Sequence, residues 1–230
     1  MGVRRAVRVW KEVLAPTSQP KETGVTLLEA VASLAIFGMI AVGAYGIESS
    51  SMNFYTDQGA KATRVSDTMS VDWTLQKLAQ VSVEAGTESY PSDGHWTATW
   101  GPTSSPVNVL LLQVSNLASI VPTNSPLYQA WVNSDDICVG LAPINGTSQL
   151  CLFPVGYNPT TNATADTSRS PVQAISNGQT DFANTTFSVT TTGFQVNLAR
   201  GVSRVATYAV PGGSRQANLS LSFAMGASDY

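Results

Sequence analysis

Histidine, cysteine and charge are scarce in this 230-residue chain, and each shortage argues against a class of function. His95 is the single histidine, Cys138 and Cys151 are the two cysteines, and charged residues make up 12% of the chain. A zinc or iron site needs several such ligands, and acid–base catalysis most often uses histidine. No glycine-rich phosphate loop is present. We therefore expect no enzyme, no metal site and no cofactor.

Proline is absent between Pro20 and Pro91. Because proline breaks helix interiors, its absence permits one long helix, which we place at residues 25–83. Residues 25–47 are apolar apart from Glu29. That length is enough for a helix to cross a bilayer. A lone acid inside such a span is costly, so it marks a functional position.

Basic residues are concentrated before this apolar run. Residues 1–24 hold five of the twelve Lys and Arg residues but two of the fifteen acids. This bias predicts that residues 1–24 stay in the cytoplasm and that the C-terminal region faces outward. An ordinary secretory signal peptide fits poorly, because the run is longer than the usual apolar core and contains an acid. An uncleaved signal anchor is the other alternative.

Residues 24–29 read Gly-Val-Thr-Leu-Leu-Glu, just where the apolar run begins. This motif resembles the class III signal of type IV pilins and type II secretion pseudopilins. The resemblance implies a leader of residues 1–24, which a prepilin peptidase cuts after Gly24, and N-methylation of Val25. Glu29 matches the family's glutamate at the fifth mature position, where it can pair with the N-terminal amine of a neighbouring subunit. Val25 replaces the phenylalanine of major pilins, which favours a minor pilin or a pseudopilin.

The resemblance further implies a structural role with no catalysis. We expect a minor pilin of a type IV pilus-like filament, which starts as a single-pass cytoplasmic membrane protein and ends in an extracellular filament on the cell surface. Its partners would be other pilin subunits, the prepilin peptidase, the inner-membrane assembly platform and membrane lipid. A pseudopilin of a type II secretion or competence apparatus is the alternative. A membrane-anchored extracellular binding domain that does not polymerise is a third reading, from another class.

A nucleic-acid partner is not expected from the charge of the chain. Arg200, Arg204 and Arg215 are the nearest approach to a basic patch in the C-terminal region. DNA-binding proteins present a much denser cluster of positive charge. DNA would therefore be a partner only if the filament serves in DNA uptake.

The second half of the long helix is amphipathic. An apolar stripe at helical spacing is predicted to face the outer domain. Its members are Ala62, Val65, Met69, Trp73 and Leu78. Four charged residues, Asp57, Lys61, Asp67 and Lys77, are predicted to lie mainly on the solvent side.

After a break at residues 86–94, apolar and polar residues alternate along several segments, as they do in β-strands. We predict strands at residues 96–100, 107–114, 127–132, 137–141, 150–153, 186–190, 194–198, 205–210 and 219–223. Residues 156–180 are rich in Asn, Thr, Ser and Pro and predict an irregular excursion. The fold class is therefore α+β, with the long N-terminal helix packed on an antiparallel β-domain of residues 84–230.

The two cysteines flank a predicted hairpin, because Asn145 and Gly146 form a turn signal between two apolar runs. In an oxidising compartment we expect a Cys138–Cys151 disulfide across this hairpin. The acidic pair Asp135 and Asp136 is interpreted as a solvated turn. A calcium site is the alternative for this pair.

Overall fold

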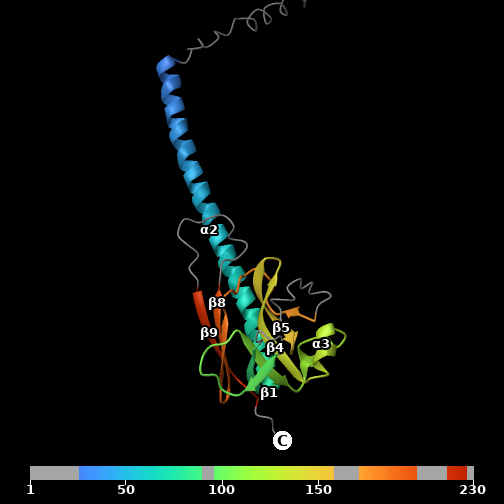
Figure 1. Ribbon diagram of the computed structural model, residues 1–230. Helices are drawn as coiled ribbons and strands as arrows, with labels where there is room; N and C mark the ends of the chain where they lie inside the picture. Colours follow the sequence, from blue (N-terminus) through green and yellow to red (C-terminus); the bar gives the residue numbers. More distant parts are fainter. Residues whose placement is uncertain (1–25, 90–95, 158–170, 201–216, 227–230) are drawn as a thin grey trace, which may run out of the picture. The chain divides into compact units, whose positions relative to one another are not determined.

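The computed structural model describes residues 26–89, 96–157, 171–200 and 217–226 (Figure 1). The chain divides into two compact units, Met1–Ser51 and Met52–Tyr230, and the second is called the head below. The predicted α+β class is confirmed, since a long N-terminal helix precedes antiparallel sheets. The predicted leader of residues 1–24 and the predicted strand at 205–210 lie outside the described residues.

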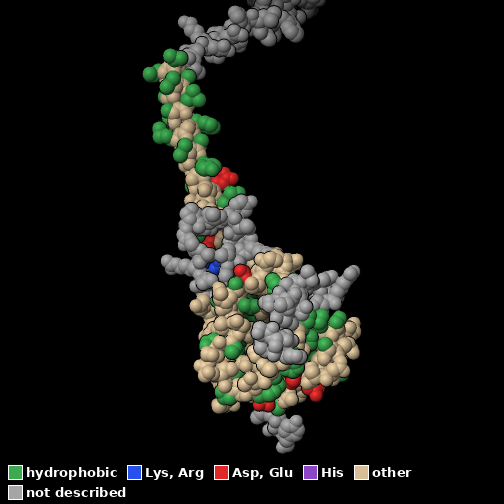
Figure 2. Space-filling view, viewed as in Figure 1, with side chains coloured by type: hydrophobic (Ala, Val, Ile, Leu, Met, Phe, Trp, Pro, Cys, Tyr) green, Lys and Arg blue, Asp and Glu red, His purple; other side chains and the backbone are tan. Residues whose placement is uncertain are grey.

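Helix α2 runs from Leu27 to Val81, within two residues of the predicted bounds. Every residue of the first unit that is described, from Thr26 to Ser51, is exposed. Figure 2 shows apolar side chains gathered along this part of the helix. The helix is long and apolar enough to cross a membrane, which is compatible with single-pass anchoring.

The described strands of the head form two antiparallel sheets. The first has the order β2-β1-β3-β4-β5-β6, and the second has the order β7-β8-β9. Val107 and Phe187 join the sheets by an isolated bridge, with N–O distances of 2.7 and 2.8 Å. The strands are β1 (Ser82–Ser89), β2 (Thr97–Trp100), β3 (Val109–Val114), β4 (Asp136–Ile144), β5 (Thr147–Pro154), β6 (Gln173–Ala174), β7 (Thr186–Thr190), β8 (Gly193–Arg200) and β9 (Ala217–Ala224).

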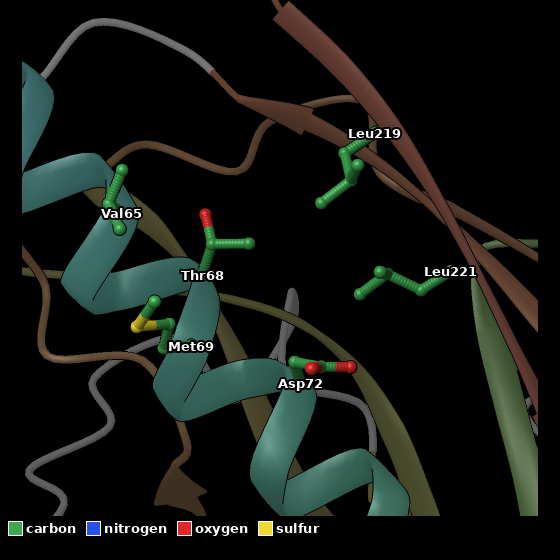
Figure 3. A pocket seen from close by; sticks show the side chains of 6 residues that line it. All are labelled: Val65, Thr68, Met69, Asp72, Leu219 and Leu221. Atoms are coloured by element: carbon green, nitrogen blue, oxygen red, sulfur yellow. The ribbon is translucent and has the colours of Figure 1, made fainter.

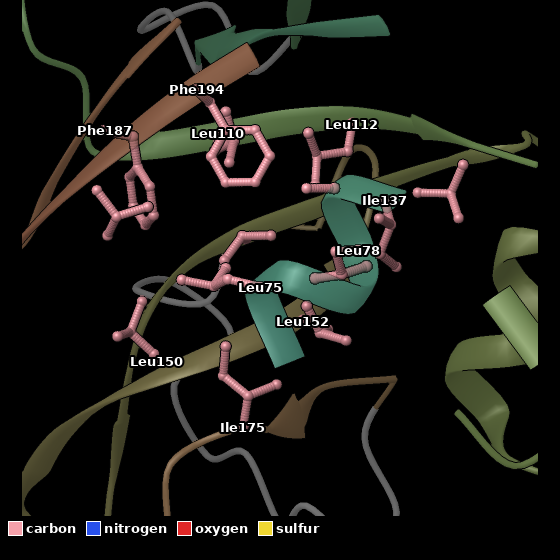
Figure 4. Packing of buried hydrophobic residues seen from close by; sticks show 14 of the residues in the cluster. Leu75, Leu78, Leu110, Leu112, Ile137, Leu150, Leu152, Ile175, Phe187 and Phe194 are labelled. Atoms are coloured by element: carbon pink, nitrogen blue, oxygen red, sulfur yellow. The ribbon is translucent and has the colours of Figure 1, made fainter. Parts of the chain in front are cut away.

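The core of the head forms around the end of α2. Leu75 and Leu78 are fully buried among side chains from both sheets (Figure 4). Residues on the opposite face of the first sheet form a second, smaller cluster that contains Leu111 and both cysteines. Alternate residues of β3 belong to the two clusters, as the two-residue period of a strand requires.

The predicted buried face of α2 is wrong for all but one of its members. Leu78 is buried as expected, whereas Ala62, Val65, Met69 and Trp73 are not. The face that is buried is rotated around the helix and includes several polar side chains. Its members are Ala60, Asp67, Thr68, Val71, Thr74, Leu75, Leu78 and Ala79.

The predicted strand at residues 127–132 is also wrong, because this segment is helix α3 (Pro126–Trp131). Ser125 caps the helix, and its Oγ accepts a hydrogen bond from the Tyr128 backbone N–H at 3.1 Å. Proline at the first helical position favours a helix start. These two signals outweigh the β-propensity of the apolar residues that follow. A single 3-10 turn, η1 (Leu117–Ser119), precedes α3.

The hairpin predicted at Asn145-Gly146 is confirmed as β4–β5. Both residues adopt positive φ angles, 51° and 74°, which a tight turn of this kind requires. The predicted break at residues 86–94 is partly wrong, since β1 follows α2 directly and extends to Ser89. Gly86 permits this strand to pair, because a Cβ there would lie 2.5 Å from the carbonyl oxygen of Thr99.

Candidate functional site

Glu29 lies in the first turn of α2 and is exposed. Thr26 precedes the helix, and its Oγ1 accepts a hydrogen bond from the Glu29 backbone N–H at 3.3 Å. A threonine followed by glutamate three residues later is the pattern of a capping box. Glu29 thus has a local reason to occupy this position as well as the predicted pairing with a second subunit. Gly24 and Val25, the predicted processing residues, lie outside the described residues.

An apolar stripe covers the solvent face of α2 in the head. It consists of Val65, Met69 and Trp73, which are 47%, 66% and 56% exposed, and is called the outer stripe below. These residues recur at four-residue spacing, so they lie on one helix face. Lys77 continues the row, with its Nζ 4.6 Å from the centre of the Trp73 ring. The outer stripe is therefore an apolar helix face with no cover from the described parts of the head.

Asp67, predicted to face solvent, is instead fully buried. Its Oδ1 accepts a hydrogen bond from the Asn177 backbone N–H at 3.1 Å. One turn later, Ser70 Oγ donates to the Ile175 carbonyl oxygen at 3.1 Å. These two bonds fasten the segment after β6 to the helix. The side chain of Asp67 is thus structural, although its Oδ2 has no hydrogen-bond partner among the described atoms.

A second buried carboxylate, Glu88 on β1, joins three segments on the far face of the first sheet. Its Oε2 accepts a hydrogen bond from the Cys138 thiol on β4. Its Oε1 accepts one from the Gly156 backbone N–H at 2.8 Å. Desolvation by burial, followed by the charge of Glu88, raises the pKa of Cys138 well above its ordinary value. Burial likewise raises the pKa of Cys151 to about 12. Both thiols are therefore protonated at neutral pH.

The two cysteines are free thiols in the structure. Cys138 lies opposite Phe153, and Cys151 lies opposite Gly140, so the cysteines are diagonal neighbours on one face of the β4–β5 pair. Diagonal Cα atoms are about 7–8 Å apart, whereas a disulfide needs about 4.4–6.8 Å. Closing the bond would require a backbone shift, and the disulfide stays a prediction for the exported protein.

This geometry predicts that the oxidation state of the thiols is decided during folding. Folded, reduced protein at pH 8 is expected to resist both iodoacetamide and glutathione disulfide, because the reactive thiolate is scarce and both sulfurs are buried. Refolding from urea with glutathione disulfide present is expected to join the two peptides in a non-reduced map. Oxidation of the folded protein at the rate of an exposed thiol would contradict this expectation.

Asp135 ends the turn after α3, and Asp136 is the first residue of β4. Asp135 adopts a positive φ of 57°, and its backbone N–H donates to the Trp131 carbonyl oxygen at 2.8 Å. Burial, and then the neighbouring charges of Asp135 and Glu84, raise the pKa of Asp136. The solvated-turn interpretation is therefore confirmed for Asp135, which is exposed, and wrong for Asp136, which is half-buried in β4. Across the described ranges, no group of three or more His, Cys, Asp or Glu residues is arranged to hold a metal ion.

Comparison of the chain with protein-family models, with curated proteins and with solved structures found no match. The sequence expectations that concern partners and assembly therefore rest on the chain alone. The residues that bear on them are Glu29 at the start of α2 and the outer stripe in the head. Sequence reasoning missed Asp67 and Glu88 as buried carboxylates, and it assigned the outer stripe to the core.

Proposed function

We propose that this protein is a structural subunit of a type IV pilus-like filament, in the role of a minor pilin. The observation that carries the proposal is the continuity of α2, a single helix of 55 residues. Its first part is apolar and exposed throughout, and its last part supplies the centre of a folded domain. Such a helix suits a subunit that is anchored in a membrane and is then assembled through the same helix.

The outer stripe supports assembly over simple anchoring. Soluble domains seldom leave large apolar side chains together on one helix face unless another surface covers them. Helices of neighbouring subunits would bury the stripe in a filament. In the apolar part, small residues allow helices to approach closely, and Gly38, Gly43 and Gly46 have open space where a Cβ would lie.

In this function the prepilin peptidase removes residues 1–24 and exposes the amine of Val25. The amine of one subunit then pairs with Glu29 of another inside the apolar layer, so that two groups costly to bury offset each other. The assembly platform of the inner membrane and the surrounding lipid are the other partners. The same features suit a pseudopilin of a secretion or competence apparatus, and the genes that neighbour this one would separate the two.

The N-terminus tests the proposal most directly. Mass spectrometry of protein from sheared surface filaments is expected to show a chain that begins at Val25 and carries an N-methyl group. Gly24→Trp is expected to leave the leader in place and to remove the protein from the filament fraction, whereas Gly2→Trp, a matched change within the leader, is expected to have no effect. Protein in the filament fraction that begins at Met1 would contradict the proposal and would favour the anchored domain that does not polymerise.

A further inference from the structure

The hydrogen bond between Cys138 and Glu88 holds the Cys138 sulfur away from Cys151. In the first sheet, β1 and β5 lie on opposite sides of β4. Glu88 belongs to β1, and Cys151 belongs to β5. The Cys138 thiol donates to Glu88 Oε2 across β3, so its sulfur is held toward β1. A disulfide requires the same sulfur to turn toward β5.

An aromatic ring lies between the two cysteines. In the β4–β5 register Cys138 faces Phe153, and Gly140 faces Cys151. These four residues form the corners of a quadrilateral on one face of the sheet, and the cysteines occupy one diagonal. A Cβ at Gly140 would lie 3.0 Å from both Cε1 and Cζ of Phe153, so the ring extends along the other diagonal. The Phe153 ring therefore crosses the line that a disulfide would follow.

Glu88 keeps its present hydrogen bonds only while Cys138 stays a thiol. The Glu88 side chain is buried, and its Oε1 accepts the Gly156 backbone N–H at 2.8 Å. A disulfide sulfur carries no proton, so oxidation would remove the donor of Glu88 Oε2. Hydrogen bonds to charged groups are stronger than neutral ones, and a buried charge that loses its donor costs free energy.

We propose that folding of the head favours the dithiol, so that the Cys138–Cys151 pair is a redox switch of stability. The Cys138–Glu88 bond and the Phe153 ring over Gly140 are together called the lock below. The lock is closed in the reduced head. The oxidised head must break the bond and displace the ring, so it is less stable. An ordinary structural disulfide has the opposite effect and stabilises the fold.

The switch operates by thiol–disulfide exchange with a small-molecule disulfide, for which glutathione disulfide serves as the probe. The thiolate of one cysteine attacks a glutathione sulfur, and the first glutathione leaves as its thiolate. The thiolate of the other cysteine then attacks the protein sulfur of the mixed disulfide and releases the second glutathione. The two protons of the protein thiols pass to the two glutathione thiolates, and the protein loses two electrons to the oxidant.

The test compares the equilibrium between dithiol and disulfide in the folded and the unfolded chain. The full chain in non-ionic detergent is equilibrated with mixtures of reduced and oxidised glutathione, in urea either below or above the unfolding transition. Equilibrium is approached from both the reduced and the oxidised protein, and non-reduced peptide maps give the joined fraction. The equilibrium constant for the disulfide is expected to be at least about tenfold smaller in the folded head. The oxidised head is accordingly expected to unfold at a lower urea concentration than the reduced head.

Two variants remove the parts of the lock separately. Glu88→Gln keeps an oxygen for the Gly156 N–H but removes the charged acceptor of the thiol. Phe153→Leu removes the ring from the diagonal and keeps an apolar side chain. Each variant is expected to raise the equilibrium constant for the disulfide in the folded head at least about fivefold, because the reduced form loses what favours it.

Two matched controls make the same chemical changes away from the thiols. Asp72→Asn replaces an acid by its amide on α2, where Asp72 lines a groove together with Leu221 of β9 (Figure 3). Phe187→Leu shortens a fully buried ring in the main core (Figure 4). A loss of stability there affects the reduced and the oxidised head equally. Both controls are therefore expected to change the equilibrium constant by less than about twofold.

Three results would overturn the proposal. The first is an equilibrium constant in the folded wild type that equals or exceeds that of the unfolded chain. The second is an unchanged constant in both Glu88→Gln and Phe153→Leu, and the third is an equal rise in the controls. If one variant does not fold, the other and the comparison of folded with unfolded wild type still decide. The measurement needs neither leader cleavage nor a filament, so its outcome is independent of the proposed function.

Discussion

Leu75→Ala is expected to lower the free energy of unfolding of the head by about 3 kcal/mol, whereas Met69→Ala is expected to change it by less than about 0.5 kcal/mol. Leu75 is fully buried in the main core, and truncation there loses apolar contact and leaves a cavity. Met69 belongs to the outer stripe and is 66% exposed, so its truncation removes little packing. The pair lies on one helix within two turns.

Urea titration of the monomeric full chain in non-ionic detergent measures both values. Intrinsic tryptophan fluorescence, to which the buried Trp131 contributes, serves as the probe. The midpoint is expected to fall for Leu75→Ala with an unchanged slope, which would indicate a change in stability rather than in the denatured state. A larger loss of unfolding free energy for Met69→Ala than for Leu75→Ala would show that the buried face of α2 is the one predicted from the sequence.

Glu29→Ala and Glu29→Gln are both expected to lower the amount of this protein in sheared filaments at least about tenfold, with insertion and cleavage retained. An unpaired charge at the centre of a bilayer costs about 3 kcal/mol on insertion scales, and about 1.4 kcal/mol already corresponds to a factor of ten. Without the carboxylate, the amine of a neighbouring Val25 would be that unpaired charge. The variants themselves insert more readily, because the helix loses its only charge in this region.

Two variants separate assembly from local helix capping. Glutamine keeps the capping box with Thr26 but lacks the negative charge, so Glu29→Gln tests the charge alone. Glu48→Gln removes an acid of the same helix beyond the apolar run and is expected to assemble as the wild type does. Normal assembly of Glu29→Gln with failure of Glu29→Ala would assign Glu29 to the helix start only. Normal assembly of both would favour a tip subunit or an anchored domain that does not assemble.

The sequence predicts the elements of this fold better than their buried faces. The bounds of α2 and the turn at Asn145-Gly146 follow from local chemistry, namely the absence of proline and a residue pair suited to positive φ. The buried face of α2 does not follow, because it carries hydroxyl groups. Thr68 Oγ1 and Thr74 Oγ1 donate to carbonyl oxygens four residues earlier, at 2.7 and 2.9 Å. Satisfied hydroxyls can be buried, and hydropathy cannot recognise them.

The buried carboxylates escape sequence analysis for a related reason. Asp67 and Glu88 are buried because backbone N–H groups distant in the sequence, those of Asn177 and Gly156, reach their oxygens. No local pattern identifies such partners. The predicted break further conceals Glu88, because it places the residue in a loop where the structure has β1. Asp67 lies four residues before Val71 and eleven before Leu78, so it shares their face of the helix. This spacing is the one sequence signal that indicates its burial.

The end of β9 returns to the end of α2, where the Gly226 backbone N–H donates to the Ala79 carbonyl oxygen at 3.0 Å. The core around α2 is therefore completed by residues that are synthesised long after the helix. Ala79 and Gly226 are 147 positions apart in the sequence, which at about 5–20 residues per second corresponds to on the order of ten seconds of translation. If the head emerges across the membrane as it is made, Leu75 and its neighbours stay uncovered throughout that interval. Folding of the head then depends on what protects the helix from aggregation until β9 has been synthesised.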